Sequence, residues 1–329
     1  MPDLALLALT LLWGTTFLLV KRALEGTSTA AFLLLRFGVA VLALAGVALV
    51  RRARFTRALL WHGVLLGLAM FLGFALQTLG LRYTTPARSG FITGLAAVAT
   101  PFFARFALGR PVPRSAFAGI ALALAGLLLL TRPFGGAPGA FYLGDVLTLA
   151  CAVAYGFQIV FTSEWSPRHP LAPLVLVEVA TTLALAPLLL PLEPWRLSFA
   201  PGFFGIVLFT GLGMTALAFF VMAWAQRHTT AVRAALIFTL EPLAAALFSH
   251  LVGGEPLLAL DWLGGGLMVL GGGGRGGRRA RRPAQGRRDP FGAFGGGAGE
   301  ACSRPLRLAG QHLIARAPRD RCRGGAVDR

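Results

Sequence analysis

The chain has 329 residues, of which 56% are hydrophobic and only 13% are charged, whereas soluble domains contain about 25% charged residues. This composition excludes one large soluble core and favours a chain that crosses a membrane several times. The formal net charge of +18 is unevenly distributed, because residues 275–329 alone hold 14 arginines and 4 acidic residues.

The apolar residues are gathered into ten long blocks, most of them close to the roughly 20 residues that a helix needs to cross hydrocarbon. Because the blocks are continuous and do not alternate, they predict helices and not membrane strands. In chain order, the predicted spans are residues 4–20, 30–50, 58–79, 87–107, 115–130, 141–161, 171–190, 203–224, 231–252 and 257–270. The start of the chain lacks the cationic region of a secretory signal, so the first span is expected to be retained.

The ten blocks form two copies of one unit. Residues 84–126 align without a gap on residues 229–271, at an offset of 145, and 12 of these 43 positions are identical. Chance would give roughly one match in ten in so apolar a chain. Nearer the start of the chain the offset is 142, and it pairs Gly14 with Gly156. A duplicated membrane unit of this size is typical of transporters built from repeats.

Each copy holds five spans, and an odd number forces the second copy to enter the membrane from the opposite face. We therefore predict an all-α membrane protein with ten transmembrane helices in two inverted five-helix repeats, residues 1–133 and 141–274, followed by a tail, residues 275–329. With the N-terminus in the cytoplasm, the cytoplasmic connections carry eight basic residues and the opposite ones five. Both chain ends are therefore expected on the cytoplasmic side.

Two charged residues lie inside predicted spans at equivalent positions of the two copies. Arg36 lies about one third into the second span, and Glu178 lies about as far into the seventh. A charge at mid-span costs roughly 2.5–3.5 kcal/mol on insertion scales, so such residues are often functional. We expect them to flank a transport path, as an ion pair or as the binder of a zwitterionic substrate. The alternatives are a structural ion pair, or an arginine that reaches the headgroups with the glutamate near the interface.

Glu241 and Pro242 lie in the middle of the ninth span. A proline frees a backbone carbonyl one turn earlier, and Glu241 is expected to face a wet gap there. Pro101 in the fourth span predicts a second kinked helix about one turn deeper. The alternative is a packing kink in which Glu241 is hydrogen-bonded to a neighbouring helix. Because Glu178 and Glu241 are the carboxylates deep in the spans, any proton coupling is expected to use one of them.

Two further arginines fall in the first turn of predicted helices. Pro86 and Ala231 each follow a threonine, a pattern typical of a helix start. Arg88 and Arg233 then lie where the helix dipole disfavours a cation. They are expected either to reach the lipid headgroups or to contact an anionic substrate at the rim of a cavity.

Aromatic and amide side chains inside the spans complete the candidate site. These residues are Trp13, Gln77, Tyr155, Gln158 and Trp224. Trp13 and Tyr155 are equivalent in the two copies, and a ring with a polar group suits a substrate cavity. The alternative is that the aromatic residues serve in packing or as anchors at the interface.

The sequence carries no motif of enzyme chemistry and none of metal or cofactor binding. The histidines lack ligand spacing, the three cysteines are scattered, and neither a nucleophile elbow nor a phosphate loop is found. We therefore expect no catalytic residue, no metal and no cofactor.

Several motifs, taken together with their order, spacing and duplication, resemble those of the EamA-type ten-helix carriers of the drug/metabolite transporter superfamily. They are Trp13-Gly14-Thr15-Thr16-Phe17, Leu35-Arg36-Phe37, Tyr83-Thr84-Thr85-Pro86-Ala87-Arg88 with Pro101, Thr229-Thr230-Ala231, Leu240-Glu241-Pro242 and Gly254-Glu255. The resemblance covers residues 1 to 271. It implies a carrier of small organic metabolites, often an exporter, whose central cavity is lined by the first four helices of each half and buttressed by the fifth. Arg110 departs from the family, which often has an acidic residue there.

The tail changes abruptly to Gly, Arg, Ala and Pro, a composition typical of disorder. Three interpretations stay open: a basic arm on anionic lipid, an arginine-glycine segment on nucleic acid, or the product of a frameshift within the tenth helix. We favour the frameshift, because the chain uses 30 arginines against one lysine, as a GC-rich gene would. No specific nucleic-acid partner is expected.

Together these features predict a secondary transporter, multi-pass in the bacterial cytoplasmic membrane, that exports a small organic metabolite by alternating access. Its partners would be that metabolite, the lipid bilayer, and a proton or a counter-substrate for coupling. The alternative is a non-transporting membrane scaffold or sensor whose basic cytoplasmic tail binds a partner.

Overall fold

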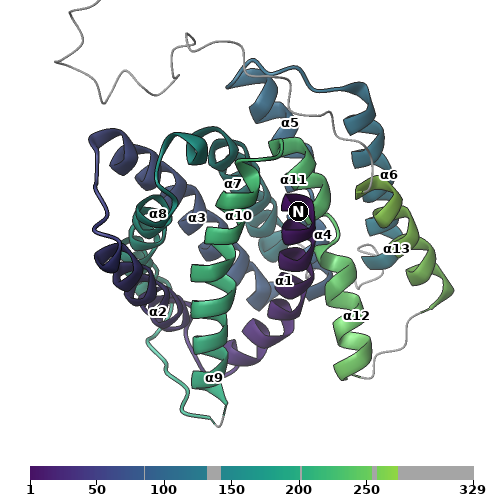
Figure 1. The fold of residues 1–329 in the computed structure, drawn as a ribbon. Coiled ribbons are helices and arrows are strands. Elements are labelled where there is room, and N and C mark those ends of the chain that lie inside the picture. The colour runs from purple at the N-terminus through teal and green to yellow at the C-terminus, as the bar shows by residue number, and fades with distance from the viewer. Residues whose placement is uncertain (85, 132–141, 201, 254–257, 273–329) are drawn as a thin grey trace, which may run out of the picture. The chain divides into compact units, whose positions relative to one another are not determined.

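A computed structural model describes residues 1–84, 86–131, 142–200, 202–253 and 258–272. Within these ranges the regular structure is helical, without a strand (Figure 1). The helices of the first half are α1 (Pro2–Leu24), α2 (Thr29–Val50), α3 (Arg57–Tyr83), α4 (Pro86–Gly94), α5 (Ala96–Phe106) and α6 (Arg114–Thr131).

The second half follows the same order with more interruptions. Its elements are α7 (Tyr142–Trp165), η1 (Ser166–Arg168), α8 (Leu171–Leu185), η2 (Ala186–Leu192), α9 (Phe203–Leu208), the π-helical η3 (Phe209–Leu217), α10 (Ala218–Gln226), α11 (Ala231–Phe238), α12 (Glu241–Gly253) and α13 (Ala259–Gly272). The tail, residues 275–329, and the Gly254-Glu255 motif lie outside the described residues, as does Thr85.

Hydroxyl side chains cap several of the helices at their starts. The Ser28 side chain accepts a hydrogen bond from the amide of Ala31 at 3.3 Å, and Thr56 accepts one from Leu59 at 3.2 Å. A side-chain oxygen at this position satisfies an amide that the first turn leaves without a partner. Short polar connections can therefore start long apolar helices.

The lengths and composition of the helices agree with a chain that crosses a membrane several times. Seven helical stretches are long and apolar enough to cross a bilayer, and they coincide with the predicted spans one, two, three, six, seven, eight and nine. The predicted fourth, fifth and tenth spans fall on the shorter apolar helices Ile92–Phe106, Arg114–Leu129 and Ala259–Gly271.

The fourth and ninth spans are broken, at equivalent residues. The first break separates α4 from α5 at Leu95, and the second separates α11 from α12 at Thr239 and Leu240. Leu95 and Leu240 are matched by the offset of 145. Pro242 lies next to the second break, as expected, because a proline leaves the carbonyl one turn earlier without its helical hydrogen bond. Pro101 does not, because it lies within α5, so proline alone does not set the position of the first break.

Glycine contacts show that the first helix of each half crosses the fourth span of the other. A Cβ atom on Gly14 would lie 2.6 Å from the Cβ atom of Ala244, and one on Gly156 would lie 2.6 Å from that of Ala99. Gly14 and Gly156 are equivalent at the offset of 142, and Ala99 and Ala244 at 145. The two crossings are therefore counterparts, as expected of halves related by a two-fold rotation.

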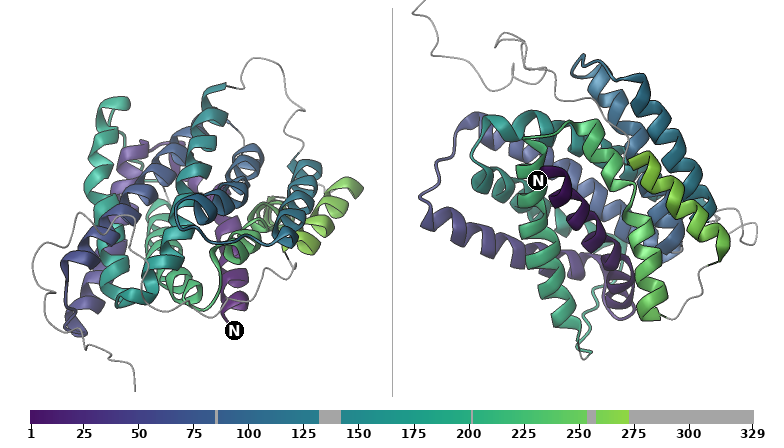
Figure 2. Two further views of the ribbon diagram at one scale, coloured as in Figure 1. Left: turned by 90° about the horizontal axis from the view of Figure 1, so that it is seen from above. Right: turned by 45° about the vertical axis from the view of Figure 1, so that its right-hand side comes forward.

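The last helices of the two halves, α6 and α13, pack side by side (Figure 1 and Figure 2). A Cβ atom on Gly271 would lie 2.6 Å from the carbonyl oxygen of Gly119, and one on Gly126 would meet the carbonyl oxygen of Gly264. At the offset of 145, Gly119 matches Gly264 and Gly126 matches Gly271. Because the start of one helix meets the end of the other, the two helices run antiparallel.

Candidate functional site

A cavity of about 90 Å³ lies among helices of both halves. Side chains of α1, α2, α3, α4, α5, α7, α10, α11 and α12 line it. Six of the lining residues are aromatic: Trp13, Phe17, Phe74, Tyr155, Phe219 and Phe238. The charged and amide side chains of the lining are Arg36, Gln77, Gln158 and Glu241. A mostly apolar cavity with a few convergent polar groups is the usual form of a small-molecule site.

Arg36 brings a positive charge from α2 to the cavity, although only 4% of the residue is exposed. Its Nε atom donates to Oγ1 of Thr215 at 2.9 Å, and its guanidinium carbon lies 4.6 Å from the centroid of the Phe74 ring. The hydrogen bond and the aromatic face hold the guanidinium in place. Nε is the only guanidinium nitrogen with a hydrogen-bond partner among the described residues, which leaves the two terminal nitrogens for a ligand.

Glu241 brings a negative charge from the second half. It is the first residue of α12, directly after the break, where the helix dipole favours a carboxylate. No hydrogen bond or ion pair engages its side chain within the described part of the chain, so the carboxylate is available to a cation. Tyr155 lines the same cavity as Arg36 and Glu241 and interacts electrostatically with each of them.

Trp13 and Tyr155 occupy equivalent places on the two sides of the cavity. The indole of Trp13 lies 5.5 Å from the ring of Phe219, and the phenol of Tyr155 lies 5.9 Å from that of Phe74. Phe74 and Phe219 match at the offset of 145. The Trp13 Nε1 atom also donates to the carbonyl of Met214 at 3.2 Å. The duplicated sequence thus builds two similar aromatic walls.

The two glutamines reach the cavity but use their amides inside the protein. Gln77 donates to Oγ1 of Thr93 at 3.0 Å, and Gln158 donates to Glu178 at 2.6 Å. Glu178 itself is 1% exposed and lies behind Gln158, outside the lining. Glu178 was expected to flank the transport path together with Arg36. In the structure Glu178 pairs with Gln158, and the carboxylate that lines the cavity is that of Glu241.

Three other predicted residues lie elsewhere. Trp224 is 38% exposed and packs on His228, so it does not line the cavity. Arg233 forms an ion pair with Asp3 at 2.7 Å rather than a rim contact with the cavity. The side chain of Arg88 lies outside the described residues. Aromatic and basic residues are also common at membrane interfaces, so residue type alone does not distinguish a residue that lines the cavity from one that lies at the interface.

The π-helical segment η3 was not predicted from the sequence. In its wide turn, Oγ1 of Thr215 donates at 2.9 Å to the carbonyl of Thr210, which lies 5 residues earlier in the chain. The same segment supplies the acceptors for Arg36 and Trp13. Such bulges often mark functional sites, but no residue pattern signals one in an apolar span.

Within the described residues, no group of three or more His, Cys, Asp or Glu side chains could hold a metal ion.

Known proteins with similar sequences are transporters. A transporter of Archaeoglobus fulgidus without a characterised substrate is 30% identical over 268 residues, which cover 82% of this chain and 83% of that protein. The uncharacterized transporter YyaM of Bacillus subtilis is 24% identical over 283 residues, covering 81% and 90%. A solved crystal structure superposes with a TM-score of 0.68 at 20% identity, covering 81% of this chain and 93% of the other, and supports the fold alone.

A family model matches the chain twice, over residues 1–132 and 142–272. These two matches account for both sets of helices that contribute to the cavity. The resemblance stated from the sequence motifs is therefore confirmed, and both the family and the relatives indicate a transporter rather than an enzyme. The chain is a multi-pass membrane protein that belongs to the EamA-like transporter family.

Proposed function

We propose that this protein is a secondary carrier of small zwitterionic organic metabolites. The observation that carries the proposal is that one cavity receives a cation, Arg36, from the first half and an anion, Glu241, from the second. The terminal nitrogens of Arg36 would bind the carboxylate of a substrate, because a guanidinium fork matches two carboxylate oxygens. Glu241 would bind its ammonium group, and the six aromatic rings would cover an apolar side chain.

The proposed mechanism is alternating access by ten spans in two inverted repeats, residues 1–133 and 141–274. Support comes from the paired crossings of Gly14 with Ala244 and of Gly156 with Ala99, and from the antiparallel α6 and α13. Halves that face opposite ways can exchange conformations, so a central site opens first to one side and then to the other. We further propose export from the cytoplasm, with both chain ends cytoplasmic and with a proton or counter-substrate as the coupling partner.

A ligand screen with analogues tests the substrate class. The full chain, purified and reconstituted in proteoliposomes, is offered amino acids, nucleosides, sugars and aromatic metabolites, and uptake and thermal stabilisation are measured. Apolar zwitterionic amino acids are expected to be transported. Their N-acetylated and carboxamide analogues are expected to bind roughly 100-fold more weakly, since each leaves one buried charge unpaired. Transport of sugars or nucleosides without transport of zwitterions would contradict the proposal.

Truncation after residue 274 distinguishes the carrier from a scaffold or sensor that works through its basic tail. Because the cavity is formed by residues before 243, the truncated protein is expected to keep its uptake rate within about twofold, inside the usual error for changes distant from a site. A matched truncation within α13 serves as the destabilised control. Loss of a partner-binding activity, with no transport in either form, would favour the scaffold.

A further inference from the structure

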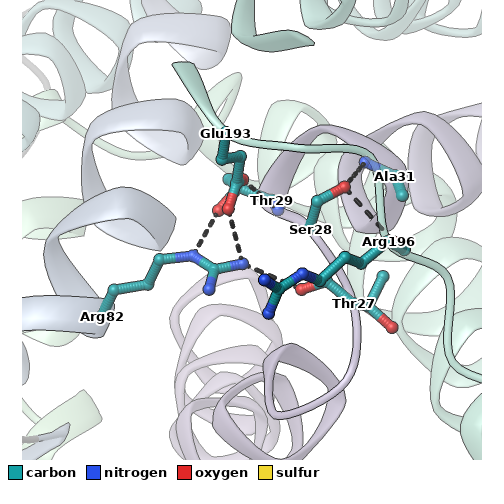
Figure 3. Close-up of polar contacts among 7 residues, drawn as sticks. All are labelled: Thr27, Ser28, Thr29, Ala31, Arg82, Glu193 and Arg196. Carbon is teal, nitrogen blue, oxygen red and sulfur yellow. Dashed lines mark hydrogen bonds and ion pairs between the residues drawn. The ribbon is translucent and has the colours of Figure 1, made fainter. Parts of the chain in front are cut away.

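A cluster of polar residues joins the two halves at the membrane face where α3 ends (Figure 3). We call it the clasp. Its residues are Thr27, Ser28, Thr29 and Arg82 from the first half and Glu193, Arg196 and Ser198 from the second. None of them lines the cavity. Leu81, next to Arg82, does line it, so the clasp lies beside one end of the cavity.

Arg82 is the centre of the clasp. It forms an ion pair with Glu193 at 2.9 Å, and its Nε atom donates to Oγ1 of Thr29 at 3.0 Å. A terminal nitrogen also donates to the carbonyl of Thr27 at 2.8 Å, while Glu193 accepts from the backbone amide of Thr29. The Arg82 side chain is 29% exposed and that of Glu193 16%. Partial burial and several shared hydrogen bonds make this more than an isolated surface pair.

The backbone of the two connecting loops completes the clasp. The amide of Ser28 donates to the carbonyl of Arg196 at 2.9 Å, and the amide of Ser198 donates to Oγ1 of Thr27 at 3.1 Å. The loop between α1 and α2 is therefore tied to the loop that follows η2. These loops belong to different halves, so the face cannot separate along this line without breaking the clasp.

The opposite face carries an incomplete counterpart of the clasp. Arg227 matches Arg82 at the offset of 145, and His169 matches Thr27 at the offset of 142. The hydrogen bond is repeated as well: Arg227 donates to the carbonyl of His169, as Arg82 donates to the carbonyl of Thr27. The position that matches Glu193 at 142 is Arg51. Each of these two residues directly follows the second span of its half. Arg51 carries the same charge as Arg227, so it cannot form with Arg227 the ion pair that Glu193 forms with Arg82.

Glycines strengthen the same asymmetry. A Cβ atom on Gly80 would lie 3.0 Å from the carbonyl oxygen of Gly144, and one on Gly144 would lie 2.9 Å from that of Gly80, so α3 and α7 touch through their backbones. The matching residues on the other face are Ala225 and Pro2, which cannot repeat this contact. Other ion pairs between the halves exist on that face, Asp3 with Arg233 and Arg110 with Glu164, but they do not involve the third span of either half.

We propose that the clasp is a lock that holds the α3-end face shut and makes the state closed at this face the more stable of the two. This inference rests on the proposed alternating access. Perfectly symmetric inverted halves would give the two closed states equal free energies. The two matched positions differ, because one holds the carboxylate of Glu193 and the other the guanidinium of Arg51. Only the α3-end face can therefore form an ion pair between this position and the arginine at the end of the third span, so the two closed states differ in free energy.

Accessibility labelling tests the lock without any substrate. Cys151, Cys302 and Cys322 are replaced by serine, Thr78→Cys is introduced at the cavity lining, and a membrane-impermeant maleimide is added from each side of sealed vesicles of both orientations. Glu193→Gln is expected to raise the labelling rate from the α3-end face by roughly fivefold, a typical size for a coupled equilibrium. Arg82→Lys, which keeps the charge but loses the fork, should act in the same direction.

Asp3→Asn is the matched control, because it breaks an ion pair between the halves on the other face. It should not raise labelling from the α3-end face. An unchanged rate in Glu193→Gln and in Arg82→Lys, with the thermal midpoint retained, would overturn the lock, as would an equal increase in Asp3→Asn. Since labelling needs no transported compound, a wrong substrate class leaves this test unaffected.

Discussion

Exchanging Glu241 for glutamine is expected to abolish the preference of the carrier for a zwitterion over its N-acetylated analogue. The variant keeps the shape of the side chain but removes the charge proposed to bind the substrate ammonium, so uptake of a zwitterion should fall roughly 100-fold, or about 2.7 kcal/mol. The N-acetylated analogue, which has lost its own ammonium charge, should lose little. Arg36→Gln is expected to abolish in the same way the preference for the zwitterion over its carboxamide analogue. Competition uptake with the three compounds in proteoliposomes measures both.

Glu178→Gln is the matched control for these two variants. Glu178 is as deep in the protein but lies behind Gln158, and a glutamine oxygen can still accept the hydrogen bond from Gln158. Its preference among the three compounds should therefore remain that of the unaltered protein. Equal shifts of preference in Glu178→Gln and Glu241→Gln would remove the argument for Glu241 as the ammonium site.

Adding a methyl group at either central crossing is expected to destabilise the protein strongly. In Gly14→Ala the new Cβ atom would lie 2.6 Å from the Cβ atom of Ala244 and 2.7 Å from the amide nitrogen of Ala245. In Gly156→Ala the backbone contacts are looser, with the nearest backbone atom at 3.3 Å. Overpacking of this kind costs about 1–3 kcal/mol. We therefore expect lower thermal midpoints in detergent, with the larger loss for Gly14→Ala.

Gly38→Ala provides the control, because no atom lies within 4 Å of the position that its Cβ would take. Alanine is the better helix former, so this variant should be neutral or stabilised by up to about 1 kcal/mol. If all three variants lost the same stability, helix propensity rather than the crossings would explain the effect. If Gly14→Ala alone were tolerated, the equivalence of the two crossings would fail.

The architecture was largely predictable because it depends on regular features of the sequence. Long apolar blocks predict helices, and the offsets of 142 and 145 predicted which residues of the two halves correspond. The crossings of Gly14 and Gly156 follow that correspondence in the structure. The positions of the breaks at Leu95 and Leu240 were not predicted. A proline shows which carbonyl loses its hydrogen bond, but the packing of neighbouring helices decides at which residue the helix is interrupted.

The site was predictable by residue type but not by partner. The depth of Arg36 and of Glu241 in their spans identified both as candidates, and both line the cavity. Nothing in the chain showed that Gln158 would satisfy Glu178, because helix rotation decides which side chains meet. Arg82 and Glu193 were overlooked for another reason: charges at helix ends are common and carry little information. Matching Arg82 with Arg227 across the copies would have drawn attention to them.

The paired helix breaks have a consequence for how this fold can diversify. At Leu95 and Leu240 the main chain turns inside an apolar span while both amides keep a hydrogen-bond partner, the carbonyl of Ile92 for Leu95 and that of Ile237 for Leu240. Because the main chain satisfies its own polar groups at both turns, the side chains around them can change while the backbone path is kept. Descendants of one duplicated gene can then acquire new cargo by altering a handful of lining residues, without rebuilding the scaffold that moves it.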